Sequence, residues 1–313
     1  MEMTKVEDLK QLLFKSLTPI ISNKCAIFDL PYYKNIGDVL IWEGEISFLN
    51  GTGKKVVYSC SPKTCLFPTL DKDVTILFQG GGNIGDLYIG HTRMLSNLIT
   101  KYQHHHIVVF PQTVYFKDSH TEQLFFSTLK NHRNLTFCCR DWKSHETVTK
   151  YLGERALMLP DMAFCINKDF LTSFNIPESK QSIWVKRNDV EKTTFNTEIQ
   201  FDKICDWPPF EHKFTVPIVI NTIFDRIVPI INSMALKKKW DKYASDDFKF
   251  DMIRTGVEFL SPYKKVYSER LHGAILSVLL DKTVIIMDNS YGKNSTFYDT
   301  WLSKFPNVEL YQG

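Results

Sequence analysis

The chain has 313 residues, 43% of them hydrophobic and 13% aromatic, which suits about two folded domains and excludes disorder over most of its length. Its 38 Lys and Arg against 35 Asp and Glu leave a net charge of only +3, without the basic stripe that nucleic-acid binding requires. No apolar run approaches the ~20 residues of a membrane helix, and charges interrupt residues 1–14, where a signal peptide would have its apolar core. We therefore expect a soluble, cytoplasmic protein that binds no nucleic acid.

The seven cysteines form no CxxC pair, and several lie inside apolar runs, as Cys138 and Cys139 do. This usage predicts free, buried thiols. Three consecutive histidines, residues 104–106, cannot converge on one ion, because neighbours on an extended segment point to opposite faces. We expect no metal and no cofactor.

In the first half, short runs of β-branched and aromatic residues alternate with longer amphipathic segments, the pattern of βα units around parallel sheets. Strands are expected near residues 25–30, 55–59, 74–79, 107–111, 135–140 and 157–163. Helices are expected near residues 38–50, 92–102, 119–130 and 142–152. Together they predict one doubly wound domain.

Polar residues and proline around residues 167–178 predict a crossing between domains, after which the pattern restarts. Strands are expected near residues 182–186, 217–221, 265–268 and 283–287. Helices are expected near residues 225–234, 248–260, 273–280 and 295–304. Residues 191–214 show no clear period and receive no assignment. The sequence thus predicts an α/β protein with two domains, residues 1–170 and 171–313.

The motif Asn-Ile-Gly-Asp occurs twice, at residues 35–38 and 83–86, and three glycines precede the second copy. Both copies are predicted where a strand passes into a helix, at the carboxyl edge of a parallel sheet, where open α/β folds bind ligands. Helix capping by Asn and Asp would explain one copy alone. Two copies favour a binding loop whose glycines admit a ligand to the backbone amides. Its candidate residues are Asn35, Gly37, Asp38, Gly81, Gly82, Asn83, Gly85 and Asp86.

The carboxylates of Asp38 and Asp86 would repel an anion, so they suit sugar hydroxyls better. Such a group can accept a hydrogen bond from a hydroxyl or remove its proton.

A second junction is predicted at residues 268–273, where Arg270 and His272 share a face of an extended segment. Arginine binds carboxylate or phosphate through a planar fork, and histidine transfers protons near neutral pH. A surface arginine beside a core histidine is the alternative, but the strand end followed by glycine favours a site. Arg187 follows another predicted strand and offers a second cation, or else an exposed ion pair with Asp189.

These segments resemble the polysaccharide pyruvyltransferase family, in order along nearly the whole chain. Further matching elements are Phe110-Pro111-Gln112-Thr113, Arg140-Asp141, Pro160-Asp161 and Tyr298-Asp299-Thr300-Trp301. The resemblance implies a GT-B-like fold with a cleft between two Rossmann-like domains, the last helix packing back on the first domain. It also implies transfer of an enolpyruvyl group from phosphoenolpyruvate to two hydroxyls of one sugar, in a polysaccharide or its lipid-linked precursor. Phosphate leaves and a pyruvate ketal remains.

By the same resemblance, the donor site takes Arg187, Arg270, Leu271 and His272, and Asp86 is also implicated. The chemistry agrees, because two arginines can hold the carboxylate and the phosphate of the donor. His272 is our candidate for the acid that protonates the methylene carbon. Asp86 would orient or deprotonate the acceptor hydroxyl, with Asp38 as second choice.

Two other function classes remain open from the sequence. One is a GT-B glycosyltransferase with a nucleotide sugar bound at the glycine-rich loop. The other is a non-catalytic saccharide-binding partner in polysaccharide assembly. Four aromatic side chains are candidates for stacking on a sugar: Trp42, Tyr88, Trp184 and Trp207. If the acceptor is lipid-linked, residues 237–240, three lysines and a tryptophan, could provide peripheral membrane contact.

Overall fold

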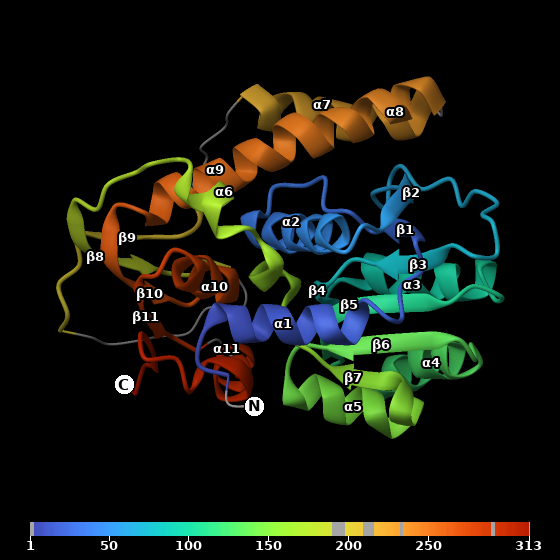
Figure 1. Cartoon of the computed structure of the whole chain (residues 1–313), viewed down its shortest axis with the longest axis horizontal. Helices are drawn as coiled ribbons and strands as arrows, with labels where there is room; N and C mark the ends of the chain where they lie inside the picture. Colours follow the sequence, from blue (N-terminus) through green and yellow to red (C-terminus); the bar gives the residue numbers. More distant parts are fainter. Residues whose placement is uncertain (1–2, 190–197, 209–215, 232–233, 289–291, 313) are drawn as a thin grey trace.

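The computed structural model describes residues 3–189, 198–208, 216–231, 234–288 and 292–312, and it contains two parallel sheets side by side (Figure 1). The larger, seven-stranded sheet has the order β2-β1-β3-β5-β6-β7, with β4 paired to β5. Its strands are β1 (Lys24–Phe28), β2 (Lys55–Ser59), β3 (Thr75–Phe78), β4 (Gly81–Gly85), β5 (Ile107–Tyr115), β6 (Leu135–Cys139) and β7 (Ala156–Met158).

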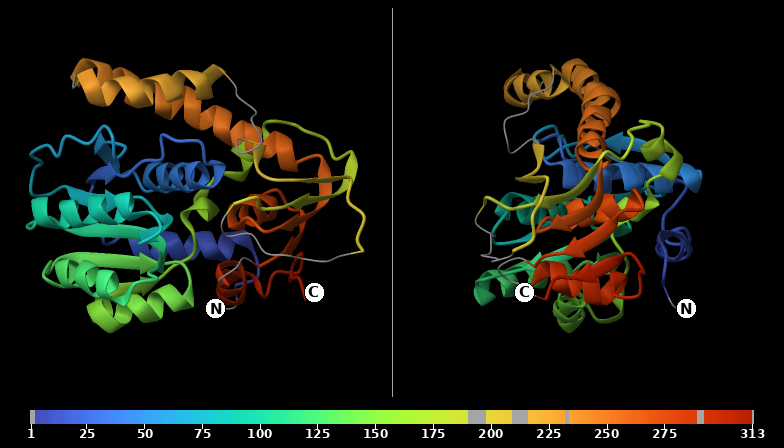
Figure 2. Two further views of the ribbon diagram at one scale, coloured as in Figure 1. Left: turned by 180° about the vertical axis from the view of Figure 1, so that it is seen from behind. Right: turned by 90° about the vertical axis from the view of Figure 1, so that its left-hand side faces the viewer.

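Helices cover both faces of this sheet, which explains why its central strands are apolar throughout. Along β1, Cys25 and Ile27 join one hydrophobic cluster, whereas Ala26 and Phe28 join the other. The first cluster lies under α1 (Val6–Leu17) and α2 (Ile36–Gly51). The second lies under α3 (Ile89–Lys101), α4 (Ser119–Lys130) and α5 (Trp142–Leu152), which Figure 2 shows from behind.

The smaller, five-stranded sheet has the order β12-β11-β10-β8-β9. Its strands are β8 (Lys180–Val185), β9 (Lys203–Cys205), β10 (Tyr263–Ser268), β11 (Thr283–Ile286) and β12 (Val308–Leu310). The helices of this half are α6 (Lys168–Thr172), α7 (Val216–Ile231), α8 (Met234–Tyr243), α9 (Lys249–Leu260), α10 (Leu271–Leu279) and α11 (Lys293–Phe297). A π-helical turn, Ala244–Phe248, joins α8 to α9, and another, Tyr298–Leu302, extends α11.

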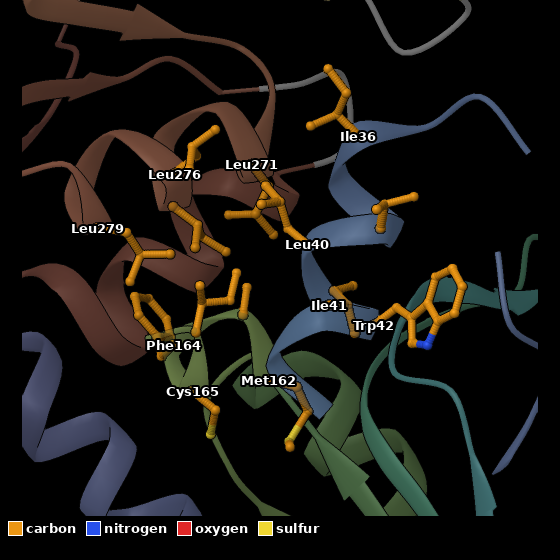
Figure 3. Packing of buried hydrophobic residues seen from close by; sticks show 14 of the residues in the cluster. Ile36, Leu40, Ile41, Trp42, Met162, Phe164, Cys165, Leu271, Leu276 and Leu279 are labelled. Carbon is orange, nitrogen blue, oxygen red and sulfur yellow. The ribbon is translucent and has the colours of Figure 1, made fainter. Parts of the chain in front are cut away.

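Helix α2 packs between the two halves of the chain. Figure 3 shows its residues Ile36 and Leu40 near Leu271 of α10, with a short 3₁₀ helix, Met162–Cys165, alongside. The approach to that segment is close, because a Cβ on Gly44 would lie 1.9 Å from the carbonyl oxygen of Met162. One hydrophobic cluster therefore runs through both halves and fixes the helix starts that face the site.

The predicted α/β class with parallel sheets is confirmed, and so are the seven free cysteines, of which only Cys65 is not fully buried. The strand predicted at residues 217–221 is wrong, since these residues lie in α7. Their β-branched run resembles a strand, but Pro217 is in the first helical turn, where no N–H is needed. The strand predicted at residues 157–163 is also too long, because β7 ends at Met158.

Six helices and strands of the described residues escaped prediction: α1, α6, α8, β4, β9 and β12. Strands β9 and β12 have three residues each, too few to show a period, and β4 is mostly glycine. Within the described residues, no helix has the length and apolarity needed to cross a bilayer.

Candidate functional site

A cavity of about 290 Å³ lies where the carboxyl ends of strands from both sheets meet. The larger sheet and its loops contribute Tyr33, Lys34, Asn35, Asp38, Gly82, Asn83, Tyr88, His91 and Arg140. The other half contributes Arg187, Asp189, Trp207, Arg270, Leu271, His272 and Lys293. The structure thus brings most of the sequence-predicted site residues to one cavity. Gly37, Gly81, Gly85 and Asp86 do not line it.

The first Asn-Ile-Gly-Asp motif starts α2 as expected. The Asn35 side chain accepts a hydrogen bond from the Gly37 N–H at 3.0 Å and donates to Asp38 Oδ2 at 2.8 Å. The Tyr33 hydroxyl donates to the same Asp38 oxygen at 2.8 Å. Burial, followed by the nearby Asp38 charge, raises the pKa of Tyr33 well above its usual value, so the phenol stays a neutral donor. Asp38 is therefore held rigidly at the cavity wall.

The second copy is built differently, which corrects the prediction of a strand-to-helix junction there. Residues 81–85 form β4 against β5, and α3 starts only at Ile89. Gly85 has φ +151°, and a Cβ would lie 1.8 Å from the Tyr115 carbonyl oxygen, so only glycine fits. At Gly82 a Cβ would lie 2.7 Å from Arg140 NH2 and 2.6 Å from Lys293 Nζ. The bare backbone here lets two cations approach.

Asp86 has a structural contact instead of a place in the cavity lining. Its Oδ2 accepts hydrogen bonds from the backbone N–H groups of Lys117 and Asp118, at 2.7 and 2.8 Å. These bonds tie the end of β4 to the segment before α4.

His272 lies in the first turn of α10 and belongs to a buried network. Its Nε2 is 3.3 Å from Asp161 Oδ2 and 3.4 Å from Arg140 NH1, and Arg140 NH1 donates to Asp161 Oδ2 at 2.5 Å. Arg140 and Asp161 are both fully buried. Burial alone would raise the pKa of Asp161, but the His272 and Arg140 charges outweigh it and hold that pKa well below its usual range. An ionised Asp161 thus orients the imidazole.

Gly37 supports His272 from the facing helix α2. A Cβ at this position would lie 2.4 Å from His272 Nδ1, so Gly37→Ala must displace the ring. We expect turnover to fall by about 10²-fold, the cost of misplacing a reacting group by ~1 Å. Thermal stability should also fall modestly, because overpacking costs about 1–3 kcal/mol and the higher helix propensity of alanine offsets only part of it. The matched control is Gly90→Ala, where a Cβ meets nothing within 4 Å; equal losses in both variants would contradict this contact's role.

The two predicted donor arginines share one carboxylate. Arg187 donates to Asp189 from Nε at 3.0 Å and from NH2 at 2.9 Å, and Arg270 NH1 donates to Asp189 Oδ2 at 2.7 Å. Arg270 also forms a two-pronged pair with the buried Asp206, at 2.8 and 2.5 Å. The Arg187–Asp189 ion pair, which the sequence offered as the alternative to a binding site, is therefore present, and both of its residues line the cavity.

Sequence reasoning missed a second histidine of the cavity lining, His91, which is paired with the buried carboxylate of Asp29. His91 Nδ1 lies 2.7 Å from Asp29 Oδ2. Asp29 follows β1 with φ +75°, a backbone conformation uncommon outside glycine. Nothing local marks this pair in the sequence, because its members are 62 positions apart.

Of the aromatic candidates, Tyr88 and Trp207 line the cavity, whereas Trp42 and Trp184 are buried elsewhere. The proposed membrane patch is smaller than expected, since Lys237 and Trp240 are buried. In the part of the chain that the structure describes, no three His, Cys, Asp or Glu side chains gather as metal ligands would.

The chain is similar to known proteins in sequence and in fold. The family model "Polysaccharide pyruvyl transferase" matches residues 35–291. The chain is 30% identical to "Putative pyruvyl transferase EpsO" of Bacillus subtilis, over 97% of this chain and 94% of that protein. It is 24% identical to "Pyruvyl transferase 1" of Schizosaccharomyces pombe, over 89% of this chain and 70% of that protein. Its fold is similar to that of a functionally uncharacterised Klebsiella pneumoniae protein, with TM-score 0.67, 19% identity and coverage of 98% and 99% of the two chains.

Proposed function

Because the chain belongs to the polysaccharide pyruvyl transferase family, we propose that it transfers pyruvyl from phosphoenolpyruvate to two hydroxyls of one sugar. The sugar is part of a polysaccharide or of its lipid-linked precursor. A cyclic ketal forms and phosphate leaves. One observation carries the proposal: two arginines and a carboxylate-bound histidine from one half of the chain face Asp38 from the other half across a single cavity. The halves, residues 1–170 and 171–313, would act as the two domains of a GT-B-like enzyme.

Donor binding is proposed at the arginines of the second half. The guanidinium groups of Arg187 and Arg270 both contact Asp189, so the distance between them already suits one carboxylate. The carboxylate of phosphoenolpyruvate would take the place of Asp189 there. Arg140 NH2 is buried beside Gly82 and has no hydrogen-bond partner among the residues that the structure describes; together with Lys293 it would attract the phosphate.

His272 would act as the acid toward the methylene carbon, since it is placed by Asp161 and lines the same cavity. The acceptor role moves from Asp86 to Asp38, because Asp38 lines the cavity and Asp86 does not. Asp38 would hold an acceptor hydroxyl, together with the Asn83 and Tyr33 side chains, which are hydrogen-bonded to each other at 3.3 Å.

A thermal-shift titration tests the donor. Phosphoenolpyruvate should raise the melting temperature, because a ligand that binds only the folded state stabilises it, by about 2.7 kcal/mol at 100 times Kd. UDP- and GDP-sugars, run in parallel, should produce no shift. Arg270→Ala should weaken phosphoenolpyruvate binding about 10- to 100-fold, the loss of a charge-assisted hydrogen bond.

The matched control is Arg254→Ala, which removes an exposed arginine paired with Glu258 on α9 and should leave the shift unchanged. A shift produced only by a nucleotide sugar would replace pyruvyl transfer with glycosyl transfer. No shift with any of these compounds would favour a non-catalytic saccharide-binding protein.

A further inference from the structure

His91, paired with Asp29, lines the cavity from a different element than His272, which is paired with Asp161. His91 is the third residue of α3, and Asp29 follows β1. Because Nδ1 of His91 is held by Asp29, Nε2 is the nitrogen left for a ligand in the cavity that the ring lines. The imidazole is 17% exposed and its partner carboxylate 3%. This is the arrangement of a proton-transferring histidine with a buried orienting carboxylate.

The surroundings of His91 make its imidazole more basic than usual. Burial by itself lowers the pKa of His91, but the hydrogen bond and charge of Asp29, together with the charge of Asp38, raise it above its usual value. The Tyr33 ring stands edge-on to the imidazole, with centroids 6.1 Å apart. Since Tyr33 donates to Asp38, the group proposed to hold the acceptor hydroxyl is adjacent to His91.

A purely structural role leaves two features unexplained. Asp29 adopts a positive φ, and its Oδ1 is buried without a hydrogen-bond partner in the described part of the chain, so this carboxylate costs folding free energy. A histidine retained only to neutralise it would not need to line the cavity. Strained backbone conformations of this kind are concentrated at functional sites.

We propose that His91, positioned by Asp29, is a second catalytic residue that removes the proton from the first acceptor hydroxyl. This inference rests on the proposed pyruvyl transfer. In the first step, the hydroxyl oxygen bonds to C2 of phosphoenolpyruvate and the C2=C3 π electrons take a proton from His272. His91 takes the hydroxyl proton. His272 is then neutral and His91 is charged.

The second step reverses the two roles. The second hydroxyl oxygen bonds to C2 and the bond from C2 to the phosphate oxygen breaks. His91 gives its proton to the departing phosphate, and His272 takes the proton of the second hydroxyl. Both histidines return to their starting states, so the transfer needs no reactant beyond phosphoenolpyruvate and the sugar.

The test measures phosphate release from phosphoenolpyruvate by the full chain with a panel of methyl hexosides. His91→Gln should lower kcat by about 10²- to 10⁴-fold, while Kd for phosphoenolpyruvate from calorimetry stays within a few-fold. Asp29→Asn should move the acidic limb of the kcat/KM profile to lower pH, because the pKa of His91 loses its main support. The matched control, His120→Gln, changes an exposed histidine outside the cavity lining and should leave kcat unchanged.

The outcomes separate this inference from the proposed function. A wild-type chain that does not bind phosphoenolpyruvate would overturn both. Turnover retained in His91→Gln, with donor binding intact, would overturn only the role of His91. Nitrogen-15 NMR of the imidazoles needs no acceptor: His91 should carry its proton on Nδ1 when neutral and titrate above about 6.5. A proton on Nε2, or a titration unchanged by Asp29→Asn, would refute the assignment.

Discussion

Replacing His272 with glutamine should lower the rate of phosphate release from phosphoenolpyruvate by about 10²- to 10⁴-fold, the usual worth of a positioned acid. Glutamine keeps a polar side chain of similar reach but cannot deliver a proton to carbon. Donor affinity should stay within a few-fold of wild type, because the proposed holders of the carboxylate, Arg187 and Arg270, remain paired as before. Steady-state kcat measures the expected loss of rate, and a calorimetric Kd measures the expected retention of donor affinity.

The role of His272 is decided by comparing His272→Gln with Arg270→Ala, which should lose mainly donor affinity. Full turnover in His272→Gln beside a loss in Arg270→Ala would mean that His272 is not the acid. A loss of donor affinity equal to the loss of kcat would instead make His272 a binding residue. The Gly37→Ala variant then adds an independent check, since it moves the same ring without changing its chemistry.

Local chemistry allowed part of this site to be predicted from the sequence. The junction at residues 268–273 was recognised because Arg270, His272 and a following glycine are close together in the chain. The structure places that segment at a strand end beside the cavity, as expected. The family resemblance rested on the same short motifs, and it is confirmed.

The contacts that orient these residues could not be predicted, because the partners are distant in sequence, although Asp161 itself belongs to one of the motifs. Asp161 is 111 positions from His272, and Asp206 is 64 positions from Arg270. Asp206 also lies in residues 191–214, which showed no period. Such pairs depend on how the two sheets are placed, and no local pattern encodes that placement.

The repeated motif misled for a different reason. Identical residues at 35–38 and 83–86 take different structures, because Gly81 and Gly85 adopt positive φ angles that direct the chain into β4 instead of a helix. Asp38 consequently reaches the cavity, whereas Asp86 does not line it and accepts hydrogen bonds from the backbone N–H groups of Lys117 and Asp118. The two copies of the motif are identical in sequence, but they have different roles in the structure.

Breaking the buried pair at the base of the cavity should have the largest effect on stability. We expect Asp161→Asn to lower the free energy of unfolding by about 3–5 kcal/mol, because the neutral amide leaves the fully buried Arg140 charge without its counterion. Asparagine can still accept the hydrogen bond from the Ala163 N–H, but its NH2 group then replaces the oxygen that accepts from Arg140, so the change removes both the charge and that hydrogen bond. The Trp301 indole N–H donates to the Arg140 carbonyl at 2.6 Å, so the loss should reach both halves of the chain. Urea unfolding followed by tryptophan fluorescence measures it.

The pH dependence of that loss has a definite sign. The pKa of Asp161 is lower in the folded than in the unfolded chain, where it is about 3.9. Its contribution to stability is therefore fully present above that value and declines as pH falls below it. The difference between wild type and Asp161→Asn should be constant from pH 7 to about pH 5 and shrink in more acidic solution. Asp71→Asn removes an exposed partner of Lys24 and should change the urea midpoint little at any pH. A difference that grew on acidification would mean that Asp161 is protonated in the folded chain, and the oriented imidazole of His272 would lose its basis.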